Sequence, residues 1–180
     1  AAIFWAHAEN FATNEQVYEI QPPTVSRALT NPLVEGPFAI VMAIGAILLC
    51  IAIAQLARAF FTLLRDYPEA DNTTNRRLIL AAVAFEIPAI FGMVILSQYT
   101  GEAHSFMHDT GSYMLFVGHS LAIAACGMCI YRLLRSTAGK QDPRLAAIRH
   151  LPGHAVVVAL CSLSFGIAYY SGKIAPDLFP

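Results

Sequence analysis

The sequence has few charged residues. Asp, Glu, Lys and Arg make up 13% of its 180 residues, whereas soluble domains average about 25%. Hydrophobic residues make up 57%, and most charges lie outside four long apolar stretches. The chain also lacks a phosphate-binding glycine loop, a nucleophile elbow and a basic nucleic-acid patch. These absences exclude an ordinary soluble domain and a nucleic-acid-binding module, and the composition indicates an integral membrane protein.

Cysteine is also scarce, and its four occurrences all fall inside apolar stretches, at Cys50, Cys126, Cys129 and Cys161. The spacing of Cys126 and Cys129 matches the C-x-x-C pattern of redox and zinc sites. Such sites need companion ligands and usually a loop or a helix N-terminus, whereas this pair lies in the middle of an apolar stretch. We therefore interpret the cysteines as small packing residues.

The four apolar stretches predict an all-α fold with four transmembrane helices, over residues 38–57, 78–99, 111–130 and 155–172. A helix needs about 20 apolar residues to cross ~30 Å of hydrocarbon, and the alternation of barrel strands is missing. We expect residues 38–180 to form a four-helix membrane bundle, preceded by an N-terminal segment, residues 1–37. The apolar start of that segment lacks Met and fits either the end of a preceding helix or a cleaved signal peptide.

The basic residues predict the orientation of the bundle, because cytoplasmic loops are rich in Lys and Arg. Nine of the eleven basic residues fall in two loops, residues 58–77 and 131–154. We expect these loops on the cytoplasmic side of a bacterial inner membrane or an organelle membrane. The loop of residues 100–110 and both termini should then lie on the outer side.

Two ionisable residues lie inside the predicted spans, Glu86 in the second and His119 in the third. An ionised carboxylate is costly to bury in a bilayer, and such residues often mark functional sites. Counting ~1.5 Å per residue from the span ends places them close enough in depth for their side chains to meet, directly or through Gln98 or a water. One interpretation is a proton or ligand site. The other is a protonated Glu86 that is hydrogen-bonded between helices for packing.

The loop between the second and third spans is rich in side chains that can bind metals. Glu102, His104, His108 and Asp109 fall within eight residues. The i, i+4 spacing of the two histidines would place them on one face of a helical turn, where a carboxylate could complete a site. No known metal signature accompanies them, so we predict no metal and no catalytic residue. A b-type haem would need a second histidine at the depth of His119, and none is present; a single haem or pigment on His119 stays an open alternative.

Two motifs on the predicted outer side resemble the Frag1/DRAM/Sfk1 family of membrane proteins. The first is Pro23-Thr-Val-Ser26, ahead of the first predicted span. The second runs from Gln98 through His108-Asp109-Thr-Gly111 to Phe116. The spacing, order and sidedness of these motifs are similar to those of the family over residues 20–172.

The resemblance implies a helical membrane fold with an ordered outer face around Ser26, Gln98, His108 and Asp109. Family members usually have six helices, and this chain would supply the second to the fifth. It departs from the family pattern at Arg27 and Ser112. Eukaryotic members are associated with lipid remodelling of membrane-anchored proteins, phosphoinositide signalling and autophagy, and the family offers no defined set of catalytic side chains.

Together these features favour a non-catalytic membrane protein with a lipid-binding or scaffold role. We expect membrane lipids as its ligands and no nucleic-acid partner. The main alternative is an accessory subunit of a larger respiratory or photosynthetic complex, which would dock on other subunits through helix faces of small residues such as Gly118, Ala122 and Ala125. A third interpretation is an enzyme or metal site at His104 and His108.

Overall fold

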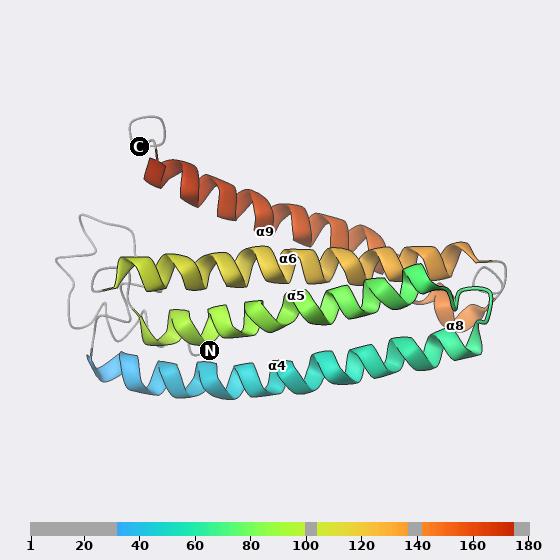
Figure 1. The fold of residues 1–180 in the computed structure, drawn as a ribbon, viewed down its shortest axis with the longest axis horizontal. Coiled ribbons are helices and arrows are strands. Elements are labelled where there is room, and N and C mark those ends of the chain that lie inside the picture. The colour runs from blue at the N-terminus through green and yellow to red at the C-terminus, as the bar shows by residue number, and fades with distance from the viewer. Residues whose placement is uncertain (1–31, 100–103, 137–141, 175–180) are drawn as a thin grey trace.

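The structure is a computed structural model that describes residues 32–99, 104–136 and 142–174 (Figure 1). This part of the chain contains five helices and no strand, which confirms the all-α prediction for it. The helices are α4 (Pro32–Asp66), α5 (Thr73–Gln98), α6 (Ser105–Arg135), the short α8 (Pro143–Ala146) and α9 (Leu151–Ile174). Ser26, Glu102 and most of the predicted N-terminal segment lie outside the described residues.

Within the described residues, three helices are long and apolar enough to cross a membrane: α4, α5 and α6. They contain the first three predicted spans, except that α5 ends one residue before Tyr99. The last helix, α9, has 24 residues, which corresponds to ~36 Å at 1.5 Å per residue. Its apolar stretch covers Leu151–Ser164 in the described part, so the fourth span stays a prediction.

The helices extend beyond the apolar stretches, and the predicted loop of residues 58–77 is wrong in its extent. Only residues 67–72 separate α4 from α5. Arginine favours helix nearly as well as leucine does, so both helices continue through their charged ends. The chain turns at Pro68, whose nitrogen has no proton to donate. Asn72 then caps α5, because its side-chain oxygen accepts a hydrogen bond from the backbone N–H of Asn75 at 3.0 Å.

The four long helices run alternately up and down, and each packs on the next in sequence (Figure 1). The most extensive contact joins α5 to α6, followed by α6 with α9 and α4 with α5. The first turns of α9 lie against α6, and its C-terminal end diverges from α6 (Figure 1). α5 and α6 therefore form the centre of the bundle.

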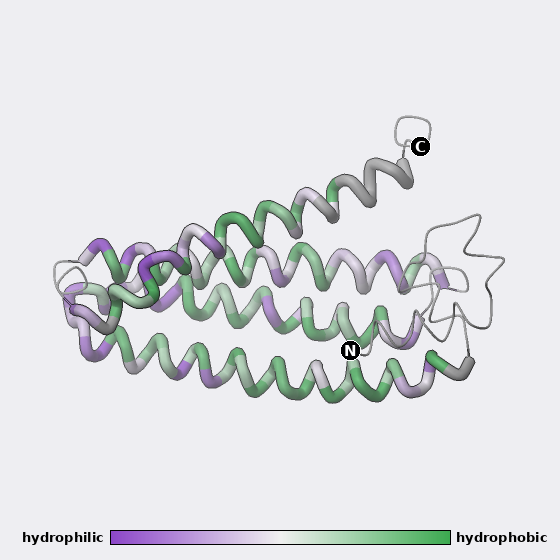
Figure 2. The backbone as a smooth tube through the Cα atoms, turned by 180° about the vertical axis from the view of Figure 1, so that it is seen from behind, coloured by the Kyte–Doolittle hydropathy of each residue, from purple (hydrophilic) through white to green (hydrophobic). Residues whose placement is uncertain are grey.

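Polar residues gather at one end of the bundle, where α8 and the turn of residues 67–72 lie (Figure 2). The arginines of the two basic regions lie at this end, in the last turns of α4 and α6, in the first turns of α5, in α8 and between α8 and α9. The middle of the helices is hydrophobic (Figure 2). The two basic regions thus share one end of the bundle, and their cytoplasmic location stays a prediction.

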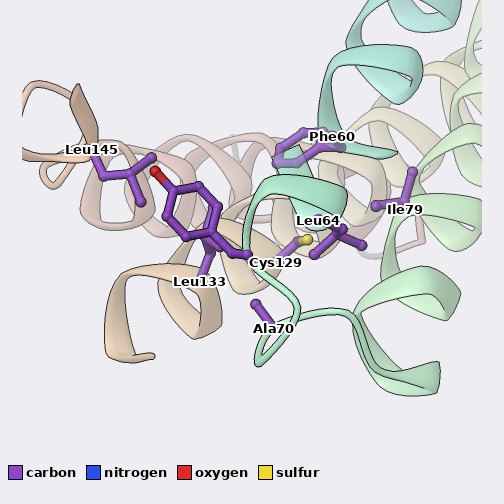
Figure 3. Close-up of a cluster of buried hydrophobic side chains, with 8 residues drawn as sticks. Phe60, Leu64, Ala70, Ile79, Cys129, Leu133 and Leu145 are labelled. Atoms are coloured by element: carbon purple, nitrogen blue, oxygen red, sulfur yellow. The ribbon is translucent and has the colours of Figure 1, made fainter. Parts of the chain in front are cut away.

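The hydrophobic core is concentrated at the same end of the bundle (Figure 3). It joins side chains of α4, α5 and α6 to Leu145 of α8, so that all four elements meet there. Cys129 is 1% exposed and belongs to this cluster, where its small sulfur-bearing side chain packs as a hydrophobe. The members are Phe60, Leu64, Tyr67, Ala70, Ile79, Cys129, Leu133 and Leu145.

A polar network crosses this core through Asn75, which is 1% exposed and belongs to no motif in the sequence. Its side-chain nitrogen donates to the carbonyl oxygen of Ala70 at 2.7 Å. Its side-chain oxygen accepts from Nε of Arg132 at 2.7 Å. Nearby, the hydroxyl of Tyr67 donates to the carboxylate of Asp142. These bonds connect the α4–α5 turn to α6 and to the start of α8, and they hold together the helices that carry the site.

Candidate functional site

α5 places a carboxylate near the centre of the bundle. Glu86 lies close to the midpoint of this 26-residue helix, roughly 18–20 Å from either end at 1.5 Å per residue. It shares a helix face with Ala82 and Ile90, four residues away on either side, and all three are buried. Glu86 itself is 3% exposed. A carboxylate at this depth is costly unless another polar group contacts it.

The structure brings Glu86 and His119 into direct contact. His119 lies near the middle of α6, and its Nδ1 is 3.0 Å from Oε1 and 3.1 Å from Oε2 of Glu86. The side chain of Glu86 is 4% exposed and that of His119 is 41% exposed. The Glu86–His119 pair therefore has one buried member and one member that reaches the surface of the bundle.

Two glycines allow α5 and α6 to approach closely enough for this contact. A Cβ atom at Gly118, next to His119, would lie 2.7 Å from the backbone oxygen of Phe85, next to Glu86. A Cβ atom at Gly92 would lie 2.5 Å from the backbone oxygen of Gly111. Both distances are too short for any side chain, so only glycine permits this spacing. Small residues have this role in many membrane helix pairs.

The charge of the pair decides which hydrogen bonds it can offer. An imidazolium beside a carboxylate and a neutral imidazole beside a carboxylic acid both have no net charge. Any other protonation state would leave a net charge in the hydrocarbon, which costs several kcal/mol. In the ion pair, the Nδ1–H of His119 donates to the carboxylate of Glu86, and in the uncharged pair the carboxylic acid of Glu86 donates to Nδ1. In both of these arrangements Nε2 of His119 carries a proton. Nε2 is therefore a hydrogen-bond donor, and it has no acceptor among the described residues.

The other predicted residues lie at the end of α5 and the start of α6, away from the pair. Gln98 is exposed and its Nε2 donates to Oγ of Ser97 at 3.3 Å. It is twelve residues, or ~18 Å, along α5 from Glu86, so the proposed bridging role of Gln98 is wrong. His108 lies in the first turn of α6, and its Nδ1 donates to the backbone oxygen of Tyr99 at 3.0 Å. Asp109 follows it and is partly buried.

His108 therefore closes the α5–α6 hairpin, because it joins the first turn of one helix to the end of the other. His104 precedes α6, and its ring makes an edge-to-face contact with Tyr99, with 5.3 Å between ring centroids. Within the described residues, no three His, Cys, Asp or Glu side chains lie together as metal ligands would. The predicted absence of a metal stays a prediction, because Glu102 lies outside these residues.

The fold and this pair define the class of protein: a helical integral membrane protein with a polar contact between its two central helices. The model of the Frag1/DRAM/Sfk1/Cwh43P N-terminal domain matches residues 1–175. The chain belongs to this family, as the motifs around Ser26 and His108 indicated. No curated protein and no solved structure matches the chain significantly.

Proposed function

We propose that this chain is a non-catalytic membrane protein that binds a lipid, and that His119 donates a hydrogen bond to the bound lipid. The observation that carries the proposal is the unequal exposure of the pair, 41% for the His119 side chain against 4% for that of Glu86. A half-exposed imidazole in the hydrocarbon layer has lost its water and has an N–H that needs an acceptor. An acceptor oxygen from the surroundings would remove this cost.

The positions of the protons in the Glu86–His119 pair restrict which ligands can bind to His119. Because Nε2 is a donor in both neutral forms, the ligand must supply an acceptor oxygen, such as an ester carbonyl or a hydroxyl. Acyl lipids carry such oxygens and are present at high concentration around the bundle. The exposed apolar side chains of α4, which include Ile40, Ile47 and Leu48, suit the acyl chains of surrounding lipid.

A non-catalytic role is supported by the surroundings of His119. Within the described residues its hydrogen-bond partner is a carboxylate on α5, and no serine, threonine or cysteine hydrogen-bonds to it as a nucleophile would. The positions of the arginines at one end support a cytoplasmic location of the α4–α5 turn and of α8. The accessory-subunit alternative would require a partner helix with an acceptor group over His119.

Mass spectrometry of the intact chain in mild detergent tests the proposal by counting the lipids that remain bound. We expect His119→Phe to retain one lipid fewer than the wild-type chain, since phenylalanine preserves the ring but has no donor. His154→Phe is the matched control, because His154 donates to the backbone oxygen of His150 in its own chain. Equal lipid retention in all three proteins would contradict the proposal. Loss of a stoichiometric protein partner from His119→Phe alone would favour the accessory subunit.

A further inference from the structure

An open cavity of about 660 Å³ lies between α4 and the start of α5, far from the Glu86–His119 pair. Three of the residues that line it are arginines: Arg58 and Arg65 of α4 and Arg76 of α5. The two α4 arginines are seven residues apart, which places them two turns apart on one helix face. The cavity, which we call the arginine cavity, thus concentrates positive charge contributed by two helices.

The charges around the arginine cavity are unequal. Its acidic residue, Asp71, accepts two hydrogen bonds from Arg76, at 2.6 and 2.7 Å. Arg58 and Arg65 are exposed and have no carboxylate within ion-pair distance in the described part of the chain. Three arginines against one aspartate leave two positive charges in excess, and these belong to Arg58 and Arg65.

The position of the arginine cavity along α4 matches the headgroup layer of a bilayer. α4 has 35 residues, or ~52 Å, which exceeds the ~30 Å of hydrocarbon and the 40–45 Å that includes both headgroup layers. The apolar stretch of α4 ends at Ala57, so Arg58 follows the edge of the hydrocarbon. Phe61, which is 37% exposed, lies one turn further and also lines the cavity. Arg58 and Phe61 therefore lie at the level of the headgroup layer, and Arg65, two turns beyond Arg58, lines the same cavity just outside that layer.

We propose that the arginine cavity binds the phosphate of an anionic phospholipid headgroup, with Arg58 and Arg65 as its main ligands. The guanidinium group presents a planar set of donors that matches two phosphate oxygens. Arg76 also lines the cavity, where Asp71 orients it and balances its charge. This site shares the ligand class of the proposed function but none of its residues.

Titration of the full chain in detergent with phosphatidylglycerol or phosphatidylcholine, followed by native mass spectrometry, tests this site. We expect the double variant Arg58→Gln/Arg65→Gln to bind phosphatidylglycerol about tenfold more weakly or worse, since each arginine near an anionic lipid contributes on the order of a several-fold effect. The matched control is Arg77→Gln/Arg149→Gln. Both control arginines are exposed, do not line the cavity, and lie at the same end of the bundle. The control has the same loss of charge, so it measures general charge attraction, and it should weaken binding several-fold less than the cavity variant does if the cavity acts as a site.

A third variant, Arg58→Lys/Arg65→Lys, keeps the charge and removes the planar donors, and it should bind with intermediate affinity. Equal weakening in the glutamine double variant and its control would overturn the proposal, because general charge attraction would then explain the binding. Binding of phosphatidylcholine as tight as that of phosphatidylglycerol would also overturn it. Inorganic phosphate that competes at the same concentration as the lipid would overturn the lipid assignment and indicate a site for free phosphate.

Two further measurements separate a loss of lipid binding from unfolding, and the arginine cavity from the proposed site at His119. Circular dichroism of the glutamine double variant should match that of the wild-type chain, because both side chains are exposed and have no ion-pair partner in the described residues. His119→Phe should bind phosphatidylglycerol with the wild-type affinity, since His119 and the arginine cavity share no residue. A failure of the proposed function at His119 would therefore leave this result unchanged.

Discussion

Replacing Gly92 with alanine should destabilise the bundle, although alanine is the better helix former. The added Cβ atom would lie 2.5 Å from the backbone oxygen of Gly111 and 2.6 Å from the backbone nitrogen of Leu115. Both neighbours are backbone atoms of α6, so no rotation of a side chain can relieve the overlap. α5 and α6 would have to separate along the face that carries the Glu86–His119 pair.

The magnitude follows from two opposing effects. Overpacking of a well-packed interior costs about 1–3 kcal/mol, and replacing a helical glycine with alanine contributes up to about 1 kcal/mol of stability. We expect a net loss of roughly 1–2 kcal/mol in the free energy of unfolding. Gly153 of α9 provides the matched control, because a Cβ atom there would meet nothing within 4 Å. Gly153→Ala should leave the stability unchanged or raise it by up to about 1 kcal/mol.

The assay is equilibrium unfolding in mixed micelles, in which the helix signal is followed as the fraction of denaturing detergent rises. Both substitutions replace a helical glycine with alanine. A loss of stability in Gly92→Ala without a loss in Gly153→Ala would therefore result from the close approach of α5 to α6. If Gly92→Ala proves as stable as Gly153→Ala, the close approach of these helices is refuted. The direct contact of Glu86 with His119 would then have to be rejected as well.

The other predictions concern the polar end of the bundle. Asn75→Leu should lower the free energy of unfolding by about 1–3 kcal/mol in the same micelles, because the Ala70 carbonyl and the Arg132 guanidinium lose a buried partner; an unchanged stability would mean that water replaces both bonds. The hydrogen bonds from Arg76 hold the pKa of Asp71 below its ordinary value of 3.8. Because the pKa is lower in the folded chain, the stability that this ion pair contributes is present above about pH 4 and is lost as the pH falls through the folded pKa. The stability difference between wild type and Asp71→Asn should therefore shrink below about pH 4, and a difference that stays constant with pH would contradict this role.

The interiors of the first three spans could be predicted because the ability of a helix to cross the bilayer depends on its own residues. Each crossing needs enough apolar residues in one uninterrupted stretch, and 38–57, 78–99 and 111–130 meet that need without reference to any neighbour. The ends of the helices could not be predicted in the same way. Hydropathy marks the edge of the hydrocarbon, whereas α4 continues through Arg58 and Arg65 because arginine is a good helix former.

The depth of the two ionisable residues could be estimated, and their contact could not. Counting residues gives the height of Glu86 and His119 in the membrane. A hydrogen bond also depends on the rotation of both helices and on the distance between their axes, which Gly92 and Gly118 make short. The bridging role of Gln98 failed for a related reason, since Gln98 lies at the end of α5, ~18 Å along the helix from Glu86.

The sequence by itself determined that this is a helical membrane protein of the Frag1/DRAM/Sfk1/Cwh43P family, because composition, span length and short motifs are local properties. Only the tertiary structure decided which polar groups meet. Glu86 contacts His119 across 33 residues, and Asn75 contacts Arg132 across 57. Whether a helix can cross the hydrocarbon depends on the length of its own apolar stretch. A contact of about 3 Å between side chains of two helices also requires those helices to pack in one particular register.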